Sequence, residues 1–143
     1  MTTQRQHTLL FVDDDPESRR SFLSIISISG FSVTTVSTIG AALDRLRDGL
    51  HPCAIMLNLS DIWTALVAFH AESAEIASIP VLLVHAQSID AARARMLGTR
   101  DILHKPIDYE LLMAAIERHC RRSHPKPSIQ VLLSPSQPYS RGT

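Results

Sequence analysis

Cysteine is scarce in this sequence. Cys53 and Cys120 are the two cysteines, and neither belongs to a Cys-x-x-Cys pair. Two isolated cysteines do not suggest the disulfide framework of a small secreted domain. We therefore expect two buried or inert thiols that carry no functional argument.

Long apolar runs are also missing. No stretch approaches the roughly 18 to 20 apolar residues needed to cross a bilayer, and residues 1–7 are too polar to resemble a signal peptide. The 143 residues are 45% hydrophobic and 20% charged, which fits one soluble domain with a single core. We expect a cytoplasmic protein that does not contact a membrane.

Glycine and net charge exclude two further classes of function. The five glycines are isolated near the ends of expected elements or in the tail, so no glycine-rich phosphate loop supports a small-ligand sensor. The formal charge is zero, but four basic residues lie beyond residue 120, leaving 10 basic against 14 acidic residues before it. A mildly acidic body does not support nucleic-acid binding as the main activity.

Apolar runs alternate with helical patterns along the chain. The strands expected are 8–12, 31–36, 53–57, 79–84 and 101–103, and the helices are 16–29, 38–50, 63–74, 89–97 and 109–121. Pro16 suits a first helical turn, while Ser88 and Asp108 are the expected N-caps of the last two helices. Gly30, Gly49 and Gly98 follow helices as stop signals.

Continuous apolar strands alternating with helices predict a parallel sheet covered on both faces. We expect a flavodoxin-like (βα)5 α/β fold with strand order 2-1-3-4-5, which places a site at the carboxyl ends of strands 1, 3 and 4. The receiver-sized domain should span residues 1–122, followed by a flexible Pro- and Ser-rich tail over 123–143. Within that tail, residues 129–133 are apolar enough to dock on a partner or on the domain, or are simply unstructured.

The polar ends of these strands resemble the receiver domains of bacterial two-component response regulators, over about residues 7–122. The resemblance rests on an acidic pair after strand 1, a Leu-Asn-Leu segment at the end of strand 3, and a Lys-Pro pair after strand 5: Asp13, Asp14, Asn58, Lys105 and Pro106. It implies a Mg²⁺ ion held by the acidic pair and by an aspartate at the end of strand 3. That aspartate would also accept the phosphoryl group. The lysine would balance the remaining charge.

The sequence departs from that pattern at the acceptor position, where Asn58 replaces the aspartate. An amide cannot form the acyl phosphate that a carboxylate forms, because its nitrogen lone pair is delocalised into the carbonyl group. His85 stands where the resemblance implies a small hydroxyl residue, and Ile102 stands where it implies an aromatic switch. Ile62 and Leu66 replace the proline and glycine of the loop after the acceptor.

Several residues have two interpretations. Asp13 and Asp14 either bind Mg²⁺ weakly or cap the first helix. Lys105 fits a structural ion pair with Asp14 better than a catalytic role, and His85 either fills the vacated phosphoryl space or ligates a metal. The cofactor is therefore none, or weakly bound Mg²⁺.

We therefore interpret the chain as a stand-alone, phosphorylation-independent receiver, a non-enzymatic interaction module in two-component or phosphorelay signalling. The alternative is a receiver phosphorylated on a substitute acid such as Asp61. The resemblance implies a protein partner, either a histidine kinase, another regulator or a second copy in a homodimer. The face of the fourth helix, fifth strand and fifth helix would bind it, through Ala92, Met96, Ile102 and Tyr109.

Overall fold

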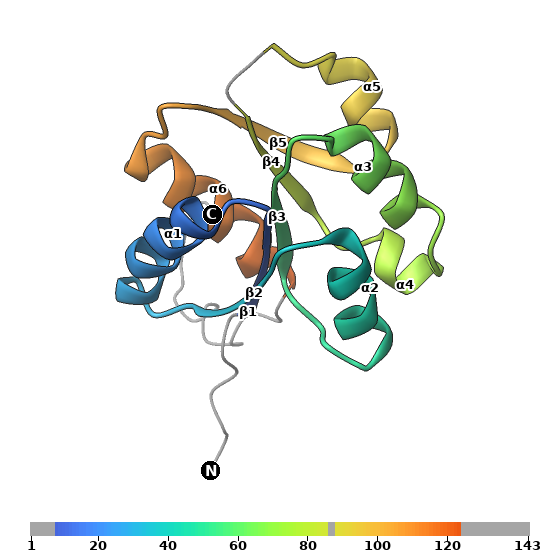
Figure 1. Ribbon diagram of the computed structural model, residues 1–143, viewed down its shortest axis with the longest axis horizontal. Coiled ribbons are helices and arrows are strands. Elements are labelled where there is room, and N and C mark those ends of the chain that lie inside the picture. The colour runs from blue at the N-terminus through green and yellow to red at the C-terminus, as the bar shows by residue number, and fades with distance from the viewer. Residues whose placement is uncertain (1–7, 86–87, 124–143) are drawn as a thin grey trace, which may run out of the picture.

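The computed structural model describes residues 8–85 and 88–123 of the 143-residue chain (Figure 1). Its strands are β1 (Thr8–Asp13), β2 (Ser32–Val36), β3 (Ala54–Asn58), β4 (Val81–His85) and β5 (Thr99–His104). Its helices are α1 (Pro16–Ile28), α2 (Ile39–Arg47), α3 (Ile62–His70), α4 (Ala74–Ala77), α5 (Ala91–Met96) and α6 (Tyr109–Ser123).

The five strands form one parallel sheet in the order β2-β1-β3-β4-β5. This confirms the predicted flavodoxin-like fold class and strand order. β3 is buried along its whole length, and β1 and β4 are buried at all but one position each. Their continuous apolar sequences follow from that burial, because both faces of a central parallel strand are covered.

Helices cover both faces of the sheet, and two hydrophobic clusters fill the layers between them (Figure 1). One cluster packs α2 and α3 against inward side chains such as Leu10 and Leu57. The other packs α1 and α6 against the opposite face, where Phe11 and Met56 are fully buried. The N-terminal ends of α1 and α6, which follow β1 and β5, therefore lie at the same edge of the sheet.

Polar side chains cap the N-termini of the helices, and two helix boundaries differ from the prediction. Asp108 accepts hydrogen bonds from the backbone N–H groups of Glu110 and Leu111, as expected for the N-cap of α6. The N-cap of α5 is Asp90 rather than Ser88. The single helix expected at 63–74 is instead α3 and the four-residue α4, because Ser73 caps a new turn after α3 has ended.

Glycine ends three helices in the left-handed region. Gly30, Gly49 and Gly98 have φ values of 90°, 106° and 100°. Other residues rarely adopt this conformation, so these positions confirm the predicted helix stops.

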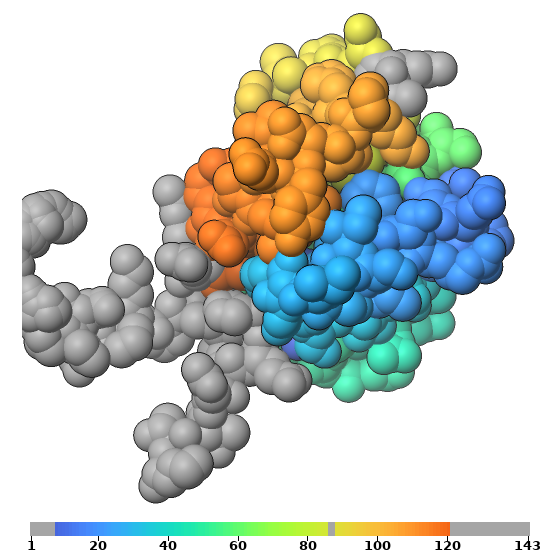
Figure 2. All heavy atoms as spheres, turned by 90° about the vertical axis from the view of Figure 1, so that its left-hand side faces the viewer, coloured from blue at the N-terminus to red at the C-terminus, as the bar shows by residue number. Residues whose placement is uncertain are grey.

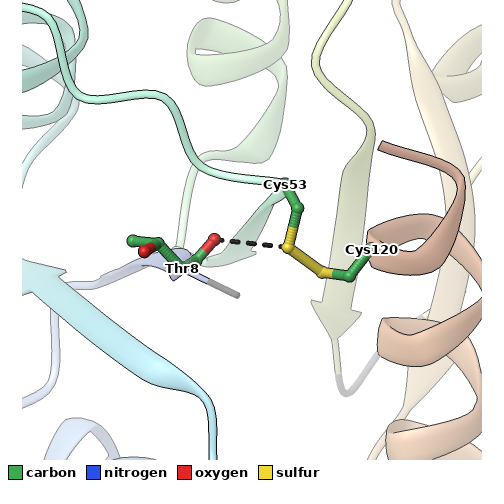
Figure 3. The surroundings of a disulfide bond; sticks show 3 residues. All are labelled: Thr8, Cys53 and Cys120. Carbon is green, nitrogen blue, oxygen red and sulfur yellow. Dashed lines mark hydrogen bonds between the residues drawn. A yellow bond between two sulfur atoms is a disulfide. The ribbon is translucent and has the colours of Figure 1, made fainter. Parts of the chain in front are cut away.

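A disulfide joins Cys53 and Cys120, with 4.8 Å between their Cα atoms (Figure 3). Both cysteines are buried as predicted, but the expectation of two free thiols is wrong. The fold brings together the residue before β3 and the end of α6, which lie 67 residues apart, and nothing in the local sequence signals that approach. The Thr8 carbonyl oxygen accepts the Cys53 backbone N–H at 2.8 Å and lies 3.3 Å from Cys53 Sγ.

The tail predicted at 123–143, including its apolar segment 129–133, lies outside the described residues apart from its first position. Within the described part of the chain, no helix is long and apolar enough to cross a membrane.

Candidate functional site

Four polar residues meet at the carboxyl edge of the sheet. Asp13 and Asn58 are directly paired in the register of β1 and β3. His85 ends β4, and its carbonyl oxygen accepts the backbone N–H of Lys105 at 2.9 Å. The parallel topology thus assembles the predicted site residues from four separate strand ends.

A cleft of about 320 Å³ opens at this edge. Its walls include Asp13, Asp14, Asn58, His85 and Lys105. The structure therefore brings together every residue of the predicted constellation except Ile102.

Asn58 is hydrogen-bonded to Asp13 and Ser18 through its side-chain nitrogen. Its Nδ2 donates to Asp13 Oδ2 at 3.0 Å and to Ser18 Oγ at 2.9 Å. Asn58 is only 8% exposed, so these bonds satisfy a buried donor that would otherwise cost about 1 to 3 kcal/mol. The amide nitrogen thus has two acceptors, and one of them is a carboxylate that lies opposite in the sheet.

Asp13 is fully buried and has partners on both carboxylate oxygens. Its Oδ1 accepts the backbone N–H of Asp15 at 2.8 Å, and its Oδ2 accepts the Asn58 amide. Arg19 Nη1 donates to the Asp13 backbone carbonyl at 2.7 Å. These donors come from the turn, from α1 and from β3, so the buried acid is satisfied within the protein itself.

Asp14 is exposed and binds the loop after β3. Its Oδ2 accepts both the backbone N–H and the hydroxyl of Ser60, each at 3.1 Å. The interpretation that Asp13 and Asp14 cap the first helix is wrong, because Asp15 is the N-cap of α1 and accepts the Glu17 N–H. Asp13 and Asp14 instead connect β1 with residues at and after the end of β3.

Lys105 is exposed and lines the same cleft. The expected ion pair with Asp14 is wrong, because none of the ion pairs among the described residues includes Lys105. Asp14 Oδ2 is hydrogen-bonded to Ser60 instead. The ε-ammonium group is therefore available to another anion.

Comparisons with known proteins agree with this geometry. No protein-family model matches the chain. The chain is 30% identical over 112 residues to the two-component response regulator ORR6 of Oryza sativa subsp. japonica, covering 73% of this chain and 65% of that protein. It is also 30% identical over 120 residues to the transcriptional regulatory protein CpxR homolog of Haemophilus influenzae, covering 80% of this chain and 51% of that protein.

A solved structure shares the same fold. The crystal structure of a putative response regulator from Chloroflexus aurantiacus superimposes with a TM-score of 0.71 at 24% identity. The match covers 82% of this chain and all of that one. In sequence and in fold, the chain is similar to response-regulator receiver domains. It spans about two thirds and about half of the lengths of the two curated relatives it matches, so their whole-protein activities do not transfer with the domain.

The receiver cleft does not offer Mg²⁺ the three carboxylates that the resemblance implied. Asn58 directs an N–H donor at Asp13, where a cation would need an oxygen ligand. Among the described residues, no three His, Cys, Asp or Glu side chains lie where they could hold a metal ion. The residues present therefore do not fit the receiver metal site, and His85 lines the cleft without belonging to a ligand cluster.

Asp61 serves as the N-cap of α3. Its carboxylate accepts the Thr64 backbone N–H at 3.1 Å and the Thr64 hydroxyl at 2.6 Å. The bond from the Thr64 hydroxyl is the largest cause of the lowered pKa of Asp61. Asp61 is not among the residues lining the cleft, which gives no support to the alternative that it replaces Asn58 as acceptor.

The predicted partner face corresponds to α5, β5 and α6. Ala92 and Met96 are exposed on α5, and Met96 is 78% exposed. Ile102 is half-buried against the hydrophobic cluster under α2 and α3. Tyr109 was assigned to the wrong surface, because its hydroxyl lies 2.8 Å from Ser29 Oγ at the end of α1 and its side chain lines a groove beside that helix.

Two site residues were missed in the sequence. Ser18 accepts from Asn58, and Ser60 donates to Asp14. Both are serines, which occur in many solvated turns and helix starts, so composition gives no signal. Ser18 lies in the first turn of α1 and Ser60 follows Asn58 by two residues, so both lie next to predicted site residues, but neither position identifies a hydrogen-bond partner.

Proposed function

We propose that this receiver domain acts as a phosphorylation-independent interaction module in two-component or phosphorelay signalling. The observation that carries the proposal is Asn58, an amide paired with Asp13 at the position where the resemblance places the phosphoryl acceptor. The amide is weakly nucleophilic, and its nitrogen is engaged in two hydrogen bonds.

The other side chains of the cleft support the same proposal. Phosphoryl transfer to a receiver needs a carboxylate nucleophile and a cation that neutralises the phosphoryl oxygens. Here both acids have partners within the protein: Asp13 binds Asn58 and Asp15, and Asp14 binds Ser60. Such a cleft is stable without metal or phosphate, so we expect Mg²⁺ to bind weakly or not at all.

The module would bind a histidine kinase, another regulator or a second copy of itself. We propose α5 and β5 as the contact surface, with Ala92 and Met96 exposed and Ile102 half-buried. Arg93 lies over the Trp63 ring, 4.2 Å from its centroid, and so ties α5 to α3. A homodimer through the same surface would be symmetric and self-complementary.

We also propose that residues 1–122 form the receiver domain and 123–143 a flexible tail. The two hydrophobic clusters take their described residues from β1 through α6, which supports this division. Removing 124–143 should then leave the melting temperature nearly unchanged. A large loss of stability would assign the tail to the domain.

Phosphotransfer is tested by incubating the protein with acetyl phosphate and Mg²⁺ and measuring its intact mass. We expect no phosphoryl adduct, under conditions where a receiver with an acceptor aspartate is modified. An acid-labile, stoichiometric adduct would contradict the proposal. If that adduct were absent from an Asp61→Asn variant, the alternative acceptor would be established instead.

A further inference from the structure

A second hollow, which is mainly apolar where the first cleft is acidic, lies between α1 and the segment that joins β5 to α6. It has a volume of about 360 Å³. Its walls are mainly apolar and are formed by Phe22 and Ile25 of α1 and by Pro106, Ile107 and Leu112. We call this hollow the α1–α6 groove; Figure 2 views the molecule from the side on which blue α1 and orange α6 adjoin.

The walls of the groove are held in place by contacts of their own. The Phe22 ring lies 5.0 Å from the buried ring of Phe11, which fixes the α1 wall against the sheet. Leu112 is buried in the core, and the bond between Tyr109 and Ser29 joins α6 to α1 at one end. A groove with fixed walls binds a ligand at a smaller entropic cost than one that must first form.

Charge in the groove is confined to one residue. Ser18, Ser21 and Tyr109 add hydroxyl groups to the apolar lining, and Lys105 is the one lining residue that carries a charge. Lys105 makes no ion pair among the described residues. An apolar wall with one available cation is complementary to a ligand that has an apolar body and one anionic group.

We propose that the α1–α6 groove binds a small amphipathic anion, whose hydrocarbon part contacts Phe22 and Ile25 and whose acidic group pairs with Lys105. The volume lies within the usual range of small-molecule sites, roughly 300 to 1,000 Å³. Ile25 is 40% exposed, so a ligand would cover apolar surface that is now open to water.

This site would also connect with the acidic cleft. Lys105 lines both hollows, and Ser18 lines the groove while accepting a hydrogen bond from Asn58. A ligand held by Lys105 would therefore act next to the Asn58 network without contacting the acids. The inference does not depend on the proposed function, because neither Asn58 nor Asp13 lines the groove.

The test uses 8-anilinonaphthalene-1-sulfonate, a fluorescent probe with an aromatic body and one sulfonate. Titration of the full chain should give saturable binding. Lys105→Met should weaken it roughly three- to fivefold, the range expected for an exposed ion pair. Ile25→Asp should abolish binding, because it places an anion in the apolar wall.

Two controls make the result specific. Val67→Asp alters an exposed apolar residue on α3, on the other face of the sheet, and this variant should bind the probe like the parent. Decanoate should displace the probe, whereas decyltrimethylammonium, with the same chain and the opposite charge, should not.

Three results would overturn the proposal. One is an absence of saturable binding to the folded parent chain. Another is equal displacement by the two competitors. The third is a dimer in sedimentation velocity that Ile25→Asp dissociates and the probe does not, because a second copy of the chain would then cover the groove.

Discussion

At the end of β3, an amide stands beside Asp13, where a second carboxylate would repel it. The Asn58 amide donates to that buried acid at 3.0 Å. A donor at this distance stabilises a buried carboxylate by hydrogen bonding, without adding a positive charge. One side chain therefore satisfies Asp13 and, in the proposed function, also removes the nucleophile.

Ser18 should contribute to this network. Ser18→Ala removes one of the two acceptors of the Asn58 side-chain nitrogen. The unfolding free energy should fall by an amount on the order of 1 kcal/mol. Urea denaturation measures it. Ser21→Ala is the matched control, because Ser21 is exposed about one turn later in the same groove wall. Equal losses in both variants would mean that Asn58 gains nothing from Ser18.

Thr64 should set the acidity of Asp61. The Thr64 hydroxyl is the largest cause of the lowered Asp61 pKa, so Thr64→Val should raise that pKa toward its usual range. A lowered folded-state pKa stabilises the protein above the unfolded pKa, and this contribution disappears as pH falls through the folded value. Carboxyl ¹³C chemical shifts followed against pH give the Asp61 pKa in both proteins; an unchanged value would assign the shift to another donor.

Among the elements, α6 is fixed to the sheet by two kinds of contact. The Cys53–Cys120 disulfide joins its last turns to the start of β3. His119 Nε2 lies 2.7 Å from Asp101 Oδ2 on β5, and Arg118 pairs with the same carboxylate at 3.4 Å. The helix is thereby held at both a central and an edge strand.

Removing the disulfide should destabilise the domain. Replacing both Cys53 and Cys120 by Ala is expected to cost about 2 to 4 kcal/mol, as for a crosslink that closes a long loop. Urea denaturation with and without dithiothreitol measures this cost. The reductant should destabilise the parent and leave the double variant unchanged. Two titratable thiols in the unreduced, unfolded parent would contradict the bond.

The elements were predictable where local signals were strong. Apolar runs located four strands and β-branched alternation located β2, while Asp108 and the stop glycines located helix ends, because these signals depend on neighbouring residues. The start of α5 was misplaced because Asp90 and Ser88 are both good caps. The disulfide could not be predicted, since it depends on a contact between β3 and α6 across 67 residues.

At the scale of the whole molecule, the sheet order decides which strand ends meet. Asp13, Asn58, His85 and Lys105 were predicted to share one edge because the order 2-1-3-4-5 was predicted correctly. Hydrogen-bond partners within that edge were not predictable. Ser60 rather than Lys105 binds Asp14, and that choice depends on the backbone path of the loop after β3.

The central claim is that the Asn58 amide takes the place of an acceptor aspartate and leaves the cleft without a third carboxylate for a metal ion. Two unit charges about 4 Å apart interact by roughly 4 kcal/mol at an effective dielectric of about 20. Asn58→Asp should therefore lower the unfolding free energy of the metal-free domain. The net loss should be on the order of 1 to 2 kcal/mol, because protonation and Lys105 offset part of the repulsion.

Thermal melts of the parent and Asn58→Asp, each in EDTA and in 10 mM Mg²⁺, test this claim most directly. A dissociation constant on the order of 1 mM would return about 1.4 kcal/mol to the variant, because the metal binds the folded form alone. We predict that the variant melts below the parent in EDTA and that Mg²⁺ raises its melting temperature far more than the parent's. Equal melting temperatures in EDTA together with equal Mg²⁺ responses would contradict the account.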